Sequence, residues 1–170
     1  MNKAKGYSLW LMPEGKPYLE IKKMTSNFSK ILKKDYFEPH VTLLGNISCT
    51  GEDILSKTSY LASIMKPFEI ELYKLNFGKE YFKRLFFLAK NSKYLTDSNE
   101  KAKKVFNIKD NSAFIPHASL VYSYFAVPKQ LIKQIIPRDI SIKFRANSLT
   151  LINANGSPKD WYKIQEFPLK

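Results

Sequence analysis

The sequence predicts an α+β fold in one domain, residues 1–170, built from two similar lobes. Three observations support this: helical and strand-like periodicities alternate, a short histidine motif occurs twice, and no flexible or charged linker divides the chain. Of the 170 residues 44% are apolar and 14% aromatic, so the chain can bury a substantial core. This composition excludes disordered and collagen-like proteins.

The first half of the chain alternates strand and helix signals. An apolar run at residues 6–12 ends at a Pro-Glu-Gly turn and predicts a strand. Apolar residues recur at helical spacing in residues 18–32, with lysines between them, and predict a helix. Residues 40–47 predict a second strand. Residues 52–65 repeat the helical spacing, with Thr50 as the expected N-cap.

The second half contains further strand and helix signals. Residues 68–77 and 81–89 are rich in aromatic and aliphatic side chains, and the Gly-Lys-Glu between them suits a hairpin turn. Residues 95–106 predict a lysine-rich helix, and residues 113–124 an apolar strand with a proline near its start. The remaining expected elements are a helix at residues 128–136 and strands at residues 140–152 and 161–167.

The charge is strongly basic but does not select a partner. The chain has 28 basic and 15 acidic side chains, a net charge of +13, and a pI near 9.7. Phosphates, nucleic acids and anionic lipids are therefore all possible partners. A solvated coat of lysines explains the charge as well as a dedicated binding surface does.

The cysteine and histidine content argues against disulfide and zinc chemistry. The one cysteine, Cys49, allows no internal disulfide, and two histidines do not supply a thiolate-rich zinc site, so we expect no metal and no cofactor. The apolar run near the amino terminus is shorter than a signal-peptide core, and no segment is long enough to span a membrane. A cytoplasmic location is the expectation.

Both histidines of the chain lie in a repeated motif. Residues 37–44 read FEPHVTLL and residues 114–121 read FIPHASLV, so both fit F-x-P-H-x-[S/T]-L-[L/V]. Before allowing for the choice of pattern, random placement gives both histidines a P-H-x-[S/T] context with a probability on the order of 10⁻⁵ to 10⁻⁴. Each copy also follows an expected strand and helix. The repeat therefore predicts two lobes related by a pseudo-twofold axis.

The spacing within the motif places chemical groups on one face. Alternate residues of a strand share a face, so His40 lies beside Thr42, and His117 beside Ser119. If the lobes face each other, two imidazoles and two hydroxyls converge on a groove with room for a phosphate. In-line phosphodiester cleavage needs one proton removed and one delivered, and histidine with a pKa near 6.5 serves both steps. The hydroxyls would donate hydrogen bonds to nonbridging oxygens.

Three alternative roles for the motif fit less well. Each histidine could be a strand residue satisfied by local hydrogen bonds, but that does not account for the duplication. The His-x-Thr spacing does not match zinc ligands, and there is no third histidine. A serine nucleophile is disfavoured because no Gly-x-Ser-x-Gly segment is present.

The paired motifs resemble the two H-x-[T/S] motifs of the two-histidine (2H) phosphoesterases. The closer resemblance is to their cyclic phosphodiesterase branch in plants and fungi, the 2′,3′-cyclic-nucleotide 3′-phosphodiesterases. Residues 7–13 (YSLWLMP) look like the opening strand of that branch, and residues 81–86 (YFKRLF) look like a central strand. Residues 119–122 (SLVY) follow the second motif in the same way. The resemblance spans most of residues 6–125.

The resemblance implies a fold, an activity and a set of site residues. The fold is bilobal, with antiparallel sheets facing a central groove and helices outside. The activity is metal-independent hydrolysis of nucleoside 2′,3′-cyclic phosphates to 2′-phosphates, and of ADP-ribose 1″,2″-cyclic phosphate. The implied site consists of His40 and His117 as the catalytic pair, Thr42 and Ser119 as phosphate ligands, and Trp10 and Tyr122 as candidates for a groove wall that stacks on a base or ribose.

Strand alternation leaves two placements open. Tyr122 falls on the face opposite His117, so it reaches the groove only if the strand bends, bulges or ends first. Lys83 and Arg84 point to opposite faces of their expected strand, so at most one of them faces the groove. The repeat makes the two histidines nearly equivalent, so the sequence does not say which one is the base.

Three functions remain in competition. The leading one is hydrolysis of 2′,3′-cyclic phosphates by water. The nearest rival is a 2H enzyme acting on 2′–5′ linkages, RNA ends or cyclic oligonucleotide messengers. A nonenzymatic RNA-binding module ranks lowest, since it does not need two histidines so placed. The expected partner is a small nucleotide cyclic phosphate or an RNA-derived substrate, with no stable nucleic-acid partner and no membrane, and the expected state is a monomer.

Overall fold

The computed structural model describes residues 4–137 and 140–170. The strands are β1 (Tyr7–Leu11), β2 (Val41–Ile47), β3 (Phe68–Phe77), β4 (Leu85–Ala89), β5 (His117–Val121), β6 (Ile142–Ala146), β7 (Ser148–Asn153) and β8 (Tyr162–Pro168). The helices are α1 (Gly15–Leu32), α2 (Gly51–Ser63), α3 (Lys93–Val105) and α4 (Lys129–Ile135), with short 3-10 turns η1 (Tyr81–Lys83) and η2 (Pro158–Asp160).

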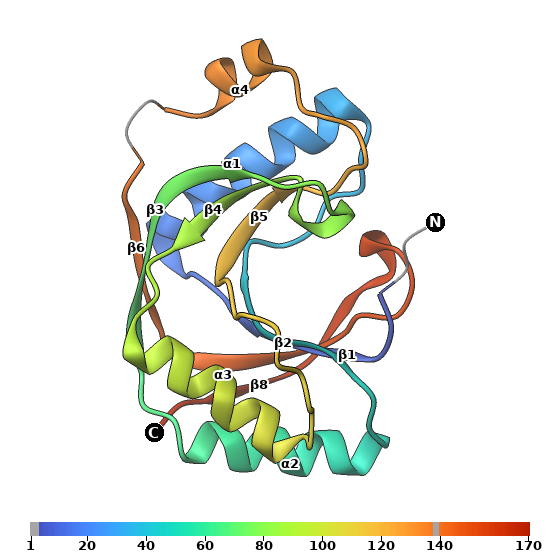
Figure 1. Cartoon of the computed structure of the whole chain (residues 1–170), viewed down its shortest axis with the longest axis vertical. Coiled ribbons are helices and arrows are strands. Elements are labelled where there is room, and N and C mark those ends of the chain that lie inside the picture. The colour runs from blue at the N-terminus through green and yellow to red at the C-terminus, as the bar shows by residue number, and fades with distance from the viewer. Residues whose placement is uncertain (1–3, 138–139) are drawn as a thin grey trace.

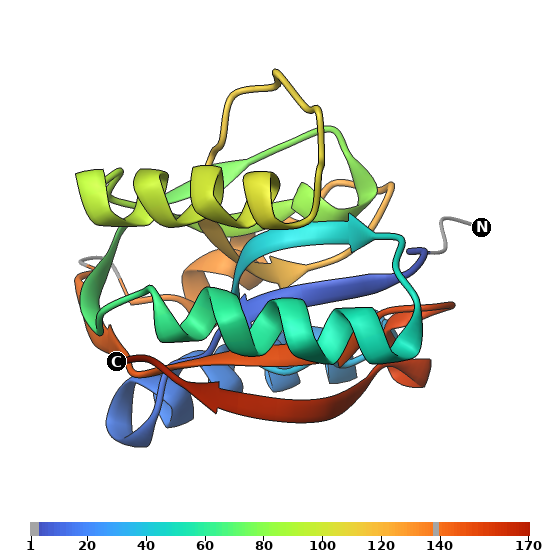
Figure 2. The same ribbon diagram turned by 90° about the horizontal axis from the view of Figure 1, so that it is seen from below.

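The strands of the described part form one antiparallel sheet in the order β6-β3-β4-β5-β2-β1-β7-β8. The sheet curls, with α1 and α4 on one side of the molecule and α2 and α3 on the other (Figure 1). In Figure 2, α2 and α3 lie side by side across the sheet, in agreement with their mutual contacts. Among the described residues, no helix combines the length and the apolar character needed to cross a bilayer.

The predicted pseudo-twofold arrangement is confirmed. The units β1–α1–β2 and β4–α3–β5 follow the same plan, and their last strands meet at the centre of the sheet, where Val41 pairs with Ala118. Each unit's helix contacts the other half of the sheet: α1 packs on β5 and β6, and α3 packs mainly on β2, with further contacts to β3 in its own half. The α+β fold with two antiparallel lobes is therefore correct, although the lobes share one continuous sheet.

Three expected strands differ from the structure. Residues 81–83 form the turn η1 and not the start of β4, because residues 78–84 close a loop in which Gly78 N–H donates to the Arg84 carbonyl at 3.3 Å. The strand expected at 113–124 is limited to β5. The strand expected at 140–152 is two strands in opposite halves of the sheet, β6 paired with β3 and β7 paired with β1 and β8.

The remaining elements agree with the predicted ones to within a few residues at their ends. Thr50 occupies the N-cap position of α2, as predicted, but its side chain makes no capping hydrogen bond. Its carbonyl accepts from Ile54 N–H at 3.0 Å and so belongs to the first helical turn. The cap therefore acts through the backbone.

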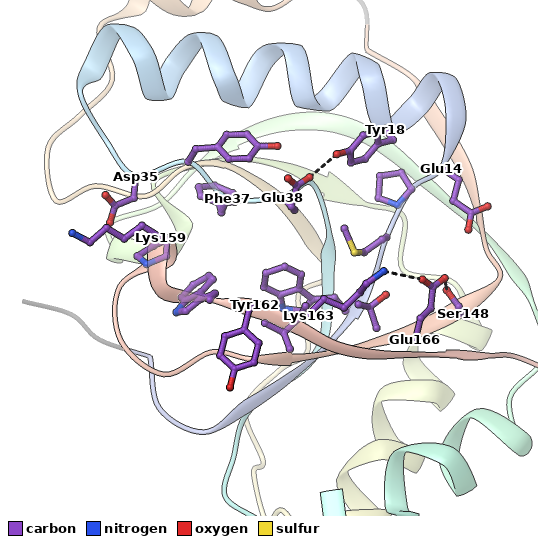
Figure 3. A pocket seen from close by; sticks show the side chains of 18 of the residues that line it. Glu14, Tyr18, Asp35, Phe37, Glu38, Ser148, Lys159, Tyr162, Lys163 and Glu166 are labelled. Carbon is purple, nitrogen blue, oxygen red and sulfur yellow. Dashed lines mark hydrogen bonds and ion pairs between the residues drawn. The ribbon is translucent and has the colours of Figure 1, made fainter. Parts of the chain in front are cut away.

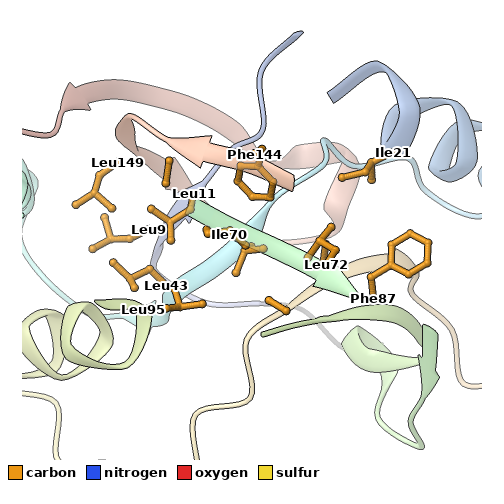
Figure 4. Packing of buried hydrophobic residues seen from close by; sticks show 14 of the residues in the cluster. Leu9, Leu11, Ile21, Leu43, Ile70, Leu72, Phe87, Leu95, Phe144 and Leu149 are labelled. Carbon is orange, nitrogen blue, oxygen red and sulfur yellow. The ribbon is translucent and has the colours of Figure 1, made fainter. Parts of the chain in front are cut away.

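The apolar core lies behind the central strands and fixes the direction of their polar side chains. Leucine, isoleucine and phenylalanine side chains from both halves of the sheet pack together with α1 and α3 (Figure 4). Val41, Leu43, Ala118 and Leu120 are each at most 1% exposed, as predicted for the residues that alternate with the histidine and hydroxyl positions. Because side chains alternate along a strand, the residues between them face the opposite side.

Candidate active site

Strand register brings the two histidine motifs together. Val41 pairs with Ala118 in the antiparallel contact between β2 and β5. Extending this register by one residue in each direction sets His40 opposite Ser119 and Thr42 opposite His117. The two imidazoles therefore lie on one diagonal and the two hydroxyls on the other. All four side chains line a single cavity of about 750 Å³.

His40 is buried and held in one tautomer. Its Nδ1 lies 2.6 Å from the Glu38 carbonyl oxygen, and since a carbonyl only accepts, Nδ1 carries the hydrogen. The ring stacks on Trp10 with centroids 3.5 Å apart and planes within 3°. Burial lowers the pKa of His40 to about 3; the positive charge of a protonated His117 acts in the same direction, and the Glu38 carbonyl opposes it. His40 is therefore neutral at pH 7, with Nε2 as its proton acceptor.

His117 has the same backbone contact but a more open environment. Its Nδ1 lies 2.7 Å from the Ile115 carbonyl oxygen, and Phe86 meets its ring edge-to-face at 5.1 Å. It is partly exposed, whereas His40 is buried. Burial is the main cause that lowers the pKa of His117; Lys83 lowers it further, while the Ile115 carbonyl and the Glu80 carboxylate raise it.

The proline of the motif explains both ring contacts. Each histidine bonds the carbonyl two residues earlier, across Pro39 or Pro116. Proline fixes its own φ and restricts the preceding residue to extended conformations, so the two motifs present that carbonyl in the same way. The phenylalanines of the two motifs also make packing contacts. Phe37 stacks on Tyr122 with ring centroids 3.7 Å apart, and Phe114 packs against the core. The repeated proline was a signal for this geometry that the sequence reasoning did not use.

The two hydroxyls differ in their surroundings. Ser119 is buried, and its Oγ donates to the Phe82 carbonyl oxygen at 2.9 Å. Thr42 is partly exposed and lines the cavity. To donate to a phosphate oxygen, the Ser119 hydroxyl must turn away from the Phe82 carbonyl, a rotation about one bond.

Trp10 and Tyr122 both line the cavity, as the groove-wall prediction requires. Tyr122 reaches it because β5 bulges at Leu120 in its pairing with β4 and then ends at Val121, so the alternation that would turn the ring away is broken. Both side chains are at most 5% exposed. His40 covers one face of Trp10, and Phe37 stacks on Tyr122, so most of each ring is already engaged.

Lys83 and Arg84 are adjacent in the chain but have different surroundings. Lys83 lines the cavity, and Arg84 does not. The Arg84 guanidinium instead donates to the carbonyl oxygens of Ser123 at 3.1 Å and Gly78 at 2.9 Å, and also to that of Tyr124. Arg84 therefore fastens the loop before β4 to the loop after β5.

Sequence reasoning missed several residues that line the cavity, among them Trp161, Phe82 and Asn99. Trp161, which precedes β8, meets Trp10 edge-on with centroids 6.0 Å apart, and Phe82 lies 6.0 Å from Trp161. Asn99, on α3, donates from Nδ2 to the Leu43 carbonyl oxygen at 2.7 Å, while its Oδ1 is buried and has no partner among residues 4–137 and 140–170. The aromatic content of the last strand was a weak signal for Trp161, and nothing in the sequence pointed to Asn99.

Across residues 4–137 and 140–170, no three His, Cys, Asp or Glu side chains are grouped so that they could hold a metal ion.

Comparison with known sequences gives consistent matches. A sequence model of the cyclic phosphodiesterase-like protein family matches residues 5–169. A cyclic phosphodiesterase of Arabidopsis thaliana is 22% identical over 117 residues, 69% of this chain; the match spans 65% of that relative's length. A 2′,3′-cyclic-nucleotide 3′-phosphodiesterase of Kluyveromyces lactis is 25% identical over 179 residues, covering 94% of this chain and 84% of that protein.

Solved structures show the same fold. The TT0787 protein of Thermus thermophilus superposes with a TM-score of 0.71 at 15% identity, covering 96% of this chain and 97% of that one. E. coli LigT complexed with 3′-AMP superposes with a TM-score of 0.66 at 12% identity, covering 99% of each chain. At these identities the likeness concerns the fold alone.

Proposed function

Because the chain belongs to the cyclic phosphodiesterase-like family of 2H phosphoesterases, we propose that it hydrolyses nucleoside 2′,3′-cyclic phosphates to 2′-phosphates. The reaction uses His40 and His117 and needs no metal ion. One observation carries the proposal: two imidazoles and two hydroxyls alternate around one cavity, with the imidazoles on one diagonal. The Nδ1 atom of each imidazole is hydrogen-bonded to a backbone carbonyl. This arrangement provides both proton transfers and hydrogen bonds for a phosphoryl group.

The different environments of the histidines support a different role for each. His40, neutral at pH 7, takes a proton from water at Nε2 while the water oxygen bonds to phosphorus. The bond from phosphorus to the ribose O3′ breaks, and His117 delivers a proton to that oxygen. His117, the less buried of the two rings, carries the proton for this step, and a negative phosphate bound beside it favours that charged form. Exchange of protons with water restores both rings.

Three groups lining the cavity stabilise the charge that develops on the nonbridging oxygens. Thr42 and Ser119 donate hydrogen bonds from their hydroxyls, and Lys83 supplies a positive charge. We extend the proposal to ADP-ribose 1″,2″-cyclic phosphate, because its reacting group is a five-membered cyclic phosphate on a ribose, as in the nucleoside substrates.

The test is turnover of adenosine 2′,3′-cyclic phosphate in EDTA, with identification of the product. We expect adenosine 2′-phosphate, and a rate about 10² to 10⁴ lower in His40→Ala and in His117→Ala. Ser119→Ala should also reduce the rate, whereas Ser56→Ala, on the exposed surface of α2, should not. Full activity in either histidine variant would refute the acid–base assignment. Loss of activity in EDTA that magnesium restores would refute the metal-free reaction.

A further inference from the structure

Each of the two catalytic strands bulges directly after its hydroxyl residue. In its pairing with β1, β2 carries an extra residue, Leu43, which follows Thr42. In its pairing with β4, β5 carries an extra residue, Leu120, which follows Ser119. The two leucines occupy the same position in the two copies of the motif. A bulge disrupts the ladder of hydrogen bonds locally and redirects nearby side chains, so these bulges affect the direction of the two hydroxyls.

A side chain from α3 holds the bulge of β2. Asn99, which is 3% exposed and lines the catalytic cavity, donates from Nδ2 to the Leu43 carbonyl oxygen at 2.7 Å. The next carbonyl, that of Leu44, accepts from the Ser8 hydroxyl on β1 at 3.4 Å. Both carbonyls at the bulge therefore have side-chain donors, and the shorter bond comes from Asn99. These bonds fix the backbone immediately after Thr42.

The chain that follows the bulge also passes beside the side chain of Thr42. A Cβ atom added to Gly45 would lie 3.7 Å from the Thr42 Cγ2 atom, an ordinary van der Waals distance. The path that the backbone takes at Leu43 therefore determines the space available to the Thr42 side chain.

The corresponding helix of the other lobe uses its buried polar side chain differently. The helix α1 packs on β5, and its buried Thr25 hydroxyl donates to carbonyl oxygens of the preceding turn of α1 itself. In β5 the Ser119 hydroxyl donates directly to the Phe82 carbonyl oxygen. The contact of Asn99 with β2 is therefore not a consequence of the repeat, and it belongs to the lobe that carries Thr42.

Asn99 uses only part of the hydrogen-bonding capacity of its amide. Its Oδ1 is buried and finds no partner in the part of the chain that the structure describes. A buried amide oxygen without a partner lowers stability, so stability alone does not explain an asparagine at this position. The same oxygen is inaccessible, so Asn99 acts through the bond that it donates and not by touching a ligand.

A second cavity lies apart from Asn99. It has a volume of about 920 Å³ and lies between the start of α1, the segment joining α1 to β2, and the strands β7 and β8 (Figure 3). It adjoins the catalytic cavity at Trp10 and Trp161, which line both. Among its polar groups, the Tyr18 hydroxyl donates to the Glu38 carboxylate at 2.7 Å (Figure 3). Of the two cavities, Asn99 lines only the catalytic one, so we look for its role in the reaction there.

We propose that Asn99 is a positioning residue for the reaction at the histidines. By holding the Leu43 carbonyl it keeps the bulge of β2 in one conformation and directs the Thr42 hydroxyl toward the bound phosphate. This inference rests on the proposed function, in which Thr42 donates to a nonbridging oxygen. Hydrogen bonds weaken steeply when their geometry is lost, so a small displacement of this hydroxyl stabilises the transition state less.

The test is a double-mutant cycle with adenosine 2′,3′-cyclic phosphate as substrate. Asn99→Ala is made in the wild type, in Thr42→Ala and in Ser119→Ala. We expect kcat to fall about tenfold in the wild type and in Ser119→Ala, but less than about twofold in Thr42→Ala. The reason is that a residue acting through the Thr42 hydroxyl has no effect once that hydroxyl is absent. Partial unfolding would lower kcat by the same factor in all three proteins.

Two further variants separate the hydrogen bond from packing. Asn99→Leu keeps a side chain of similar size and removes the donor, so it should lose as much kcat as Asn99→Ala even where the melting temperatures of the two variants differ. Ser98→Ala is the matched control, since Ser98 is the preceding residue of α3, is 6% exposed and lines neither cavity. Its kcat should stay within about twofold of the wild type.

Binding of inorganic phosphate gives a readout that does not depend on turnover. Both tryptophans of the chain line the catalytic cavity, so intrinsic fluorescence reports on phosphate binding there. Asn99→Ala and Thr42→Ala should each weaken phosphate binding. The double variant should bind phosphate as weakly as Thr42→Ala alone.

Three results would overturn the positioning role: unchanged kcat in both Asn99 variants, an equal loss of kcat in all three backgrounds, or losses that follow the melting temperature. In each case turnover that still depends on both histidines would leave the proposed function intact. Full turnover in the histidine variants would instead contradict the proposed function. The phosphate-binding cycle would then decide by itself whether Asn99 acts through Thr42.

Discussion

Burial of His40 makes the stability of the fold depend on pH in the range where most side chains do not titrate. The pKa of His40 is about 3 in the folded protein, and an unfolded histidine has a pKa of about 6.5. As the pH falls from 7 to 5, the unfolded chain binds a proton at this position and the folded protein does not. The free energy of unfolding therefore rises with pH across this range and decreases on acidification.

The expected magnitude follows from the linkage relation. Between pH 7 and pH 5, His40 should reduce the free energy of unfolding by about 2 kcal/mol. The result depends little on the folded pKa, since any value well below 5 gives the same difference. His117 adds a smaller effect in the same direction, because burial also lowers its pKa.

The assay is urea denaturation of the wild-type protein and of His40→Gln at pH 7 and pH 5. Glutamine cannot bind the proton, so the variant should lose about 2 kcal/mol less than the wild type on this change of pH. The stability of the variant at pH 7 is irrelevant to the comparison, because only the pH dependence is measured. The same pH dependence in both proteins would refute the buried, neutral state of His40.

Two other predictions concern residues near His117 and the loops around it. Lys83→Met should raise, and Glu80→Gln lower, the pH at which kcat/KM falls on the alkaline side, because these charges shift the pKa of the acid His117 in opposite directions. Shifts of the same sign in a pH–rate profile would contradict the assignment of His117 as the acid. Arg84→Lys should lower the free energy of unfolding by about 2–3 kcal/mol, since an ammonium cannot serve all the carbonyls that the guanidinium bonds. An unchanged urea midpoint would show that these bonds contribute nothing.

The sequence by itself determined the chemical content of the site. The duplicated motif predicted His40, His117, Thr42 and Ser119 as site residues, and the structure places all four around one cavity. The motif could predict this because the two-residue period of a strand is a local property that one sequence displays directly. Hydrophobic periodicity predicted the α+β class and the order of most elements, and the repeated motif predicted the pseudo-twofold plan. Periodicity predicts the ends of strands less accurately, and residues 81–83 were wrongly predicted to belong to a strand. The loop there closes through a contact between its two ends, which periodicity does not show.

The tertiary structure decided everything that depends on burial. The motifs are almost the same locally, yet His40 lies flat against Trp10 from another strand, while His117 meets only the edge of Phe86 and stays partly exposed. The cavity-facing position of Tyr122, and the second cavity beyond Trp10, also follow from long-range packing. A strand's pattern specifies which residues share a face, but the desolvation that separates the two histidines comes from residues distant in the chain.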